Sequence, residues 1–192
     1  MKLSRAAFGV WCATSLVLGV LMLMRHAVAL PATPRTDTRL ATDLAALREP
    51  GDDGRWMAVH VVYSACQCSQ RIVDHLATSE RPAGVRETVV LVGSAENAPR
   101  LVAHGFRVRS MTPPQLVEKL HVEGAPLFLL VDPAGQVRYS GGYTITKQGA
   151  DVRDLAIMND VMGGASVTPL ALLGCAVSDR LKKWLRPLEM IL

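Results

Sequence analysis

The 192-residue chain has few aromatic residues and few cysteines: aromatics make up 5% of it, and its four cysteines stand at positions 12, 66, 68 and 175. So few cysteines, so unevenly spaced, do not form a disulfide framework of the kind that holds small secreted domains together. The net charge is only +4, and the Lys and Arg residues are scattered without interleaved aromatics. We therefore expect no nucleic-acid partner. Nor does any segment recur at a repeat-protein period.

Apolar residues, in contrast, make up 49% of the chain, and charged residues make up 20%. This composition is typical of a packed globular core rather than of a disordered chain. The length suits one domain of ordinary size together with an anchor or a tail.

An uncharged apolar run over residues 7–24 follows Lys2 and Arg5. About 20 such residues cross a bilayer as a helix, and the preceding basic residues favour a cytoplasmic amino terminus. We therefore predict a single-pass anchor in the cell membrane, with the following domain on the extracytoplasmic (periplasmic) side. A cleaved signal peptide is the alternative, because residues 26–29 end in a small-x-small pattern, although Arg25 and His26 separate this site from the run. Both interpretations place the domain where disulfides persist.

Composition then divides the chain into five parts. We predict a leader at 1–6, the anchor (or uncleaved signal) at 7–24, a linker at 25–54, a globular domain at 55–164 and an amphipathic segment at 165–192. The linker begins rich in Pro and Thr, and a short helix over 40–48 is possible before the Pro50-Gly51 break.

Within the domain, apolar runs typical of strands alternate with stretches of helical periodicity. Strands are predicted at 56–63, 87–92, 106–109, 126–131 and 136–140, and helices at 69–78, 97–104, 113–120 and 152–162. Residues 132–135 (Asp-Pro-Ala-Gly) predict a hairpin turn between the last two strands. This order indicates a three-layer α/β domain, with helices on both faces of a mixed sheet.

Three stretches carry a family resemblance: VVYSACQCSQRI (61–72), VVLVGSAENAPRLVAHGF (89–106) and EGAPLFLLVDPAGQVRYSGGY (123–143). In these stretches the chain resembles the thioredoxin superfamily, especially the membrane-anchored extracytoplasmic branch that reduces protein disulfides during cytochrome c maturation. The resemblance implies a thioredoxin-like α/β/α fold with a mixed central sheet, over roughly residues 55–162.

The resemblance also implies the site. It places Cys66 at the family's nucleophile position at a helix start, where the helix dipole favours a thiolate. It implies a cis peptide bond at Pro126, in a loop that faces this cysteine. The family has Cys-x-x-Cys, whereas this chain has Cys66, Gln67 and Cys68, and Ser69 falls where the second cysteine normally stands.

The resolving thiol is left open by the sequence. A Cys66–Cys68 bridge needs Cys66 to lie outside the helix, because side chains two residues apart on a helix diverge. Cys175 is the other candidate, at the start of a helix predicted over 170–188. We predict that Cys12 is a small apolar residue of the membrane run. We predict that His60 lies in the core with its hydrogen-bonding groups paired, and that His75 is exposed to solvent.

The leading interpretation is an enzyme, a membrane-anchored extracytoplasmic thiol–disulfide oxidoreductase that uses its Cys-x-Cys site. It would act on a protein disulfide, need no organic cofactor, and take electrons from a membrane or extracytoplasmic thiol reductant. The alternative is a thioredoxin-like protein that binds or delivers copper(I) or another soft metal through Cys66 and Cys68, because thiolates select such metals.

Overall fold

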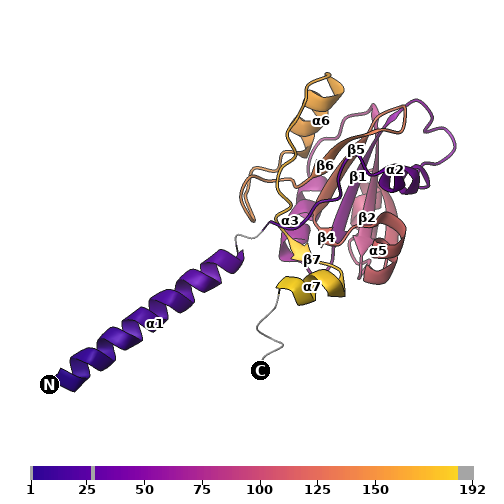
Figure 1. Cartoon of the computed structure of the whole chain (residues 1–192). Helices are drawn as coiled ribbons and strands as arrows, with labels where there is room; N and C mark the ends of the chain where they lie inside the picture. The colour runs from indigo at the N-terminus through magenta and orange to yellow at the C-terminus, as the bar shows by residue number, and fades with distance from the viewer. Residues whose placement is uncertain (1, 27–28, 186–192) are drawn as a thin grey trace.

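The computed structural model describes residues 2–26 and 29–185, with side chains for 6–21 and 29–185. Its first element is a long helix, α1 (Lys2–His26), that projects away from the rest of the described chain (Figure 1). The predicted helical run over 7–24 lies within it. Among the residues whose side chains are described, no helix has both the length and the apolarity needed to cross a membrane.

A five-stranded sheet forms the centre of the domain, in the order β3-β2-β1-β5-β6. Its strands are β1 (Trp56–Tyr63), β2 (Val85–Val92), β3 (Arg107–Met111), β5 (Leu127–Val131) and β6 (Val137–Gly141). β1, β2 and β3 pair in parallel, while β5 pairs antiparallel with both β1 and β6. The mixed sheet predicted from the sequence is therefore confirmed, and the turn at 132–135 joins β5 to β6.

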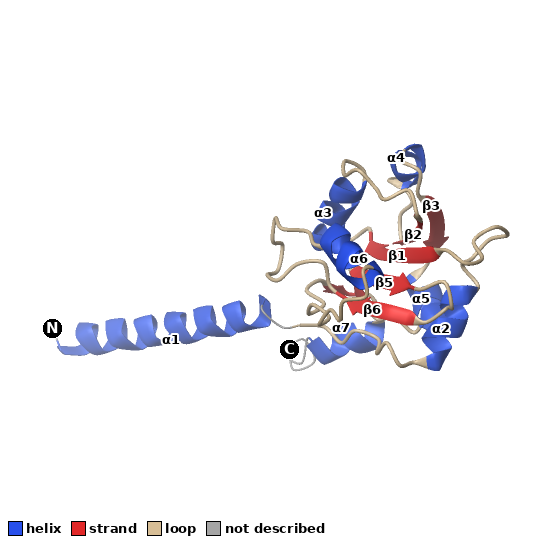
Figure 2. Ribbon diagram, turned by 90° about the horizontal axis from the view of Figure 1, so that it is seen from above, coloured by secondary structure: helices blue, strands red, loops and turns tan. Residues whose placement is uncertain are grey.

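Helices cover both faces of the sheet (Figure 2). They are α2 (Thr38–Ala45), α3 (Gln67–Leu76), α4 (Ala98–Ala103), α5 (Pro113–Leu120) and α6 (Asp154–Met162). One apolar cluster joins β1 to α2 and α5, and a second joins the opposite face of β1 to α3 and α6. The central strands β1 and β5 are largely apolar on both faces because both faces are covered. The architecture is the three-layer, thioredoxin-like α/β fold that the resemblance implied.

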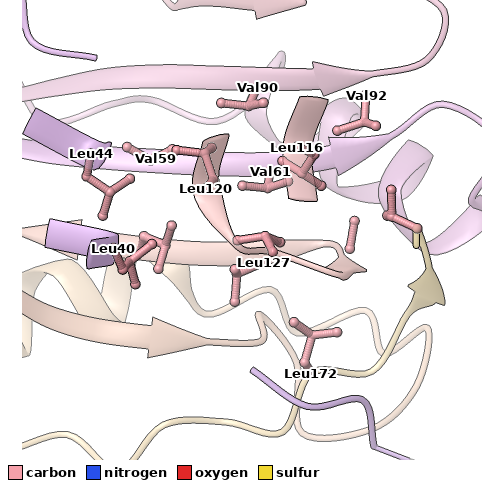
Figure 3. Packing of buried hydrophobic residues seen from close by; sticks show 14 of the residues in the cluster. Leu40, Leu44, Val59, Val61, Val90, Val92, Leu116, Leu120, Leu127 and Leu172 are labelled. Atoms are coloured by element: carbon pink, nitrogen blue, oxygen red, sulfur yellow. The ribbon is translucent and has the colours of Figure 1, made fainter. Parts of the chain in front are cut away.

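Residues 30–52 pack on this domain, which corrects the predicted linker over 25–54. Leu40 and Leu44 of α2 have no exposed surface, and Leu30 is 6% exposed. Figure 3 shows Leu40 and Leu44 among the leucines and valines of the sheet. Asp37 caps this helix, because its side chain accepts hydrogen bonds from the backbone of Arg39 and Leu40. An amphipathic helix buries its leucines wherever a matching apolar face is available.

The carboxy-terminal region also differs from the prediction. A helix was expected over 170–188, but only α7 (Asp179–Leu185) is helical there. Residues 186–188 of the expected helix lie outside the described residues. The residues before α7 form short backbone pairings instead: Leu172 forms a bridge with Leu30, and β7 (Cys175–Ala176) pairs antiparallel with β4 (Gly124–Ala125). Backbone pairing with these distant partners outweighs the helical spacing of the apolar residues, and Gly174 adds little to helix stability.

Candidate active site at the start of helix α3

Cys66 lies between β1 and α3, where the sequence placed it. It is the N-cap residue of α3, with φ −112° and ψ 117°, and is therefore outside the regular helix. Its N–H donates to the carbonyl oxygen of Tyr63 at 3.0 Å, and its own carbonyl oxygen accepts from the N–H of Gln70 at 3.1 Å. The side chain is thus held beside the free N–H groups of the first helical turn, the place where a thiolate is stabilised.

Polar side chains fix the turn that carries Cys66. The Ser69 hydroxyl accepts a hydrogen bond from the N–H of Tyr63 at 3.0 Å, and Gln70 donates to the carbonyl oxygen of Ser64 at 2.8 Å. Asn97 in turn donates to the side-chain oxygen of Gln70 at 3.0 Å. Ser69, at the position of the family's second cysteine, is buried and closes the turn. It satisfies a backbone donor there that would otherwise lack a partner.

A disulfide joins Cys66 to Cys175, with the two Cα atoms 5.9 Å apart and the residues 109 positions apart in the sequence. The bridge is therefore not the Cys66–Cys68 one that the leading interpretation expected; it is formed with the alternative partner. Cys68 is a free thiol with 5% exposure, inside the first turn of α3. It lines a small pocket together with Pro126 and Tyr143. Cys66 is therefore bonded to Cys175 of β7, whereas Cys68 faces the pocket.

The Ala125–Pro126 peptide bond is cis, as the resemblance implied. Ala125 is the last residue of β4, and its carbonyl oxygen lies 3.8 Å from the sulfur of Cys66. Opposite Ala125 in the ladder stands Cys175. The disulfide, the end of β4 and Pro126 therefore form one site, built from three segments that are far apart in the sequence.

Behind the site, the core on the α3 and α6 side contains a buried chain of charged groups. Asp154 lies between His75, at 2.8 Å, and Arg81, also at 2.8 Å. Arg81 also pairs with Glu87 at 2.5 Å. The prediction that His75 is solvated is wrong, because the ring is paired and only 22% of its side chain is exposed.

His60 continues this chain from the middle of β1. One ring nitrogen lies 2.9 Å from Glu87 and the other 2.9 Å from the hydroxyl of Tyr143. The predicted role of His60 as a satisfied core residue is confirmed, since it has no exposed surface and both nitrogens have partners.

The carboxylates of this chain are kept ionised. Burial alone would raise the pKa of Asp154, but the hydrogen bond from His75 and the charge of Arg81 lower it to about 2. The pKa of Glu87 also lies below its ordinary value, because hydrogen bonds from His60 and Arg81 outweigh its burial. Burial raises the pKa of Tyr143 well above its ordinary value, so this phenol stays protonated as the partner of His60.

The soft-metal alternative gains no support from this geometry. Cys66 is bonded to Cys175, so in this state it offers no thiolate to a metal. Among the described residues, no group of three or more His, Cys, Asp or Glu side chains is placed to hold a metal ion.

Two solved structures resemble the fold of this chain. An uncharacterized conserved protein from Geobacillus kaustophilus aligns over 66% of this chain and 78% of its own, with 16% identity and a TM-score of 0.50. A hypothetical protein from Sinorhizobium meliloti 1021 aligns over 70% of this chain and 82% of its own, with 17% identity and a TM-score of 0.50. A thioredoxin-like superfamily protein aligns over 71% of this chain and 96% of its own, with 21% identity, but its TM-score of 0.38 is too low to support an argument.

No protein-family model matches the chain, and no curated protein matches it either. At these identities a structural likeness indicates a shared fold and not a shared activity. The function must therefore be argued from Cys66, Cys175 and their surroundings.

Proposed function

We propose that this protein is a thiol–disulfide oxidoreductase whose redox-active pair is Cys66 and Cys175. The observation that carries the proposal is the disulfide itself. It links a buried cysteine at a helix start to a cysteine that reaches it from 109 positions away, beside Pro126. A disulfide that only stabilises the fold gains nothing from a cysteine at a helix start. A nucleophilic cysteine does gain, because the helix start stabilises its thiolate.

The two cysteines differ in exposure, and we infer the order of the exchange steps from this difference. Cys66 has no exposed surface, while Cys175 is partly exposed. A thiolate of an external dithiol reductant attacks the sulfur of Cys175, the Cys66–Cys175 bond breaks, and Cys66 leaves as a thiolate at the start of α3. The second thiol of the reductant then displaces Cys175. The reductant ends as a disulfide, and the protein has gained two electrons and two protons.

The reduced pair then acts on a substrate disulfide. The Cys66 thiolate attacks one substrate sulfur and forms a mixed disulfide, and the other substrate sulfur leaves as a thiolate. Cys175 attacks the sulfur of Cys66 in this mixed disulfide, which restores the Cys66–Cys175 bridge and releases the substrate as a dithiol. Cys175 takes the resolving role in this scheme because it already stands within bonding reach of Cys66.

The location of this activity stays a prediction from the sequence. The apolar run over 7–24, with Lys2 and Arg5 before it, favours a membrane tether and an extracytoplasmic domain. The protein substrate and the membrane or extracytoplasmic thiol reductant are likewise proposals that follow from that location.

Replacing the resolving cysteine tests the assignment. Full-length Cys175→Ser, reduced and mixed with a protein disulfide, should attack once and accumulate as a mixed disulfide through Cys66, because no thiol resolves it. Cys68→Ser is the matched control and should turn over like the wild type. Non-reducing gel electrophoresis with mass spectrometry detects the trapped species. If Cys68→Ser accumulates the mixed disulfide and Cys175→Ser does not, the resolving role belongs to Cys68. If the wild type shows no thiol–disulfide exchange with the protein disulfide, the proposed function is refuted.

A further inference from the structure

The carboxy-terminal chain covers the place where a substrate would have to reach Cys66. We propose that residues 172–178, here called the closing segment, cover the edge of β4 as a cap that reduction of the Cys66–Cys175 disulfide releases. The inference rests on the proposed function, which needs Cys66 to become accessible. In the oxidised state the protein would occupy its own strand-binding edge, and in the reduced state it would offer that edge to an extended peptide that carries a cysteine.

The closing segment is bound as an added strand. β7 lies beside β4 (Figure 1), and in this pairing Ala176 stands opposite Gly124 and Cys175 opposite Ala125, the residue before Pro126. Immediately beyond, the N–H of Val177 donates to the carbonyl oxygen of Glu123 at 2.7 Å, and the N–H of Ser178 donates to the same oxygen at 3.3 Å. Backbone pairing of this kind accepts any extended chain, because it does not depend on side chains.

Gly174 lets the segment approach this closely. A β-carbon at this position would overlap the carbonyl oxygen of Ala125 and would lie 2.7 Å from the Cδ of Pro126. Both neighbours belong to the site and neither is the end of a flexible side chain, so a larger residue could not be accommodated by a side-chain movement. The absence of a β-carbon at Gly174 therefore allows this segment to pair closely with Ala125.

Few backbone contacts hold the closing segment, so the covalent link matters. β4 and β7 are two residues long each, and short edge pairings belong to the part of a structure that opens most readily. Val177 and Leu172 are buried, and the Ser178 hydroxyl donates to Glu123 at 2.9 Å, which favours the closed state. The disulfide adds to these contacts by preventing the segment from leaving, and reduction removes that restraint.

Hydrogen exchange of the full-length protein tests the cap without any turnover. The amide of Val177 should exchange at least about tenfold faster in the reduced wild type than in the oxidised wild type, because local opening becomes more frequent. Cys175→Ser, which cannot form the bridge, should exchange like the reduced wild type without any reductant. Equal protection of this amide in the two redox states would overturn the proposal.

A glycine variant supplies a second, independent measurement. Gly174→Ala should expose the Val177 amide even under oxidising conditions. Gly84→Ala is the matched control, since a β-carbon there meets no atom within 4 Å, and its exchange at Val177 should equal that of the wild type. Protection in Gly174→Ala equal to that in the wild type would refute the steric argument. If the protein reduces disulfides but the Val177 amide exchanges equally in both redox states, the cap is refuted and the proposed function stands. If exchange depends on the redox state but the protein does not reduce disulfides, the proposed function is refuted and the redox-dependent opening stands.

Discussion

Cys66→Ser is expected to lose protein-disulfide reduction down to the background rate of the reductant alone. Cys66 is the thiol that the geometry places at the helix start, and a serine hydroxyl does not attack disulfides. The measurement is the rate at which the full-length protein reduces a protein disulfide while an external dithiol regenerates it. Cys12→Ser is the control for replacing a cysteine as such, because Cys12 is an exposed residue of α1 that is remote in sequence from the site.

Loss of activity has to be separated from loss of stability. Cys66→Ser also removes a disulfide between residues 109 positions apart, and losing such a link typically costs about 2–5 kcal/mol. Cys175→Ser loses the same bridge but keeps the attacking thiol. We therefore expect similar denaturation curves for the two variants, with a trapped mixed disulfide only in Cys175→Ser. If Cys66→Ser reduced the substrate at the wild-type rate, Cys66 would not be the nucleophile.

The second large effect is expected at Asp154, in the buried charged chain behind the site. Asp154→Asn should lower the free energy of unfolding by about 3 kcal/mol, since removing one member of a buried ion pair leaves its partner uncompensated. The partners here are His75 and Arg81, and the Asp154 side chain has no exposed surface. Urea denaturation measures the change. The control is Asp151→Asn, because the Asp151 side chain is 76% exposed and, within the described part of the chain, its ion pair is with Arg153; it should change stability by less than about 0.5 kcal/mol. An equally small effect of Asp154→Asn would contradict the argument.

The same carboxylate sets a dependence of stability on pH. The pKa of Asp154 in the folded protein is about 2, below the ordinary value of 3.8. Its ionised form therefore stabilises the fold fully above about pH 4, and this contribution is lost as the pH falls toward 2. Wild-type stability should decline through this window, and Asp154→Asn should show a shallower decline.

Much of the fold could be predicted because its signals are local. β1 coincides with the strand predicted over 56–63, where nearly every residue is apolar. α5 coincides with the helix predicted over 113–120. It begins with Pro113 after a Thr112 cap, and Gln115 completes the capping box. At these places the sequence pattern alone decides the conformation.

The features that the prediction missed depend on contacts between distant segments. The sequence indicates a possible short helix over 40–48, which overlaps α2, but nothing local shows that Leu40 and Leu44 pack on a sheet that begins at residue 56. His75 lies 79 positions from its partner Asp154, so their pairing has no signature in either neighbourhood.

The error of greatest consequence concerns the carboxy-terminal segment. The spacing of Val177, Leu181 and Trp184 suggested one helix, and this obscured the strand at Cys175. Gly174 was the available signal, because a glycine directly before a cysteine indicates close backbone contact as readily as a helix start. The position of Cys66 could be predicted, whereas its partner could not be chosen between Cys68 and Cys175 without the fold.

Peptide mapping of the oxidised protein tests whether Cys66 and Cys175 form the disulfide. The full-length chain is treated with a mild oxidant, its free thiols are alkylated, and it is digested without reduction before mass spectrometry. We expect a linked pair of peptides that contain Cys66 and Cys175, with Cys68 alkylated. A linkage between Cys66 and Cys68, or alkylation of Cys66, Cys68 and Cys175 together, would contradict it.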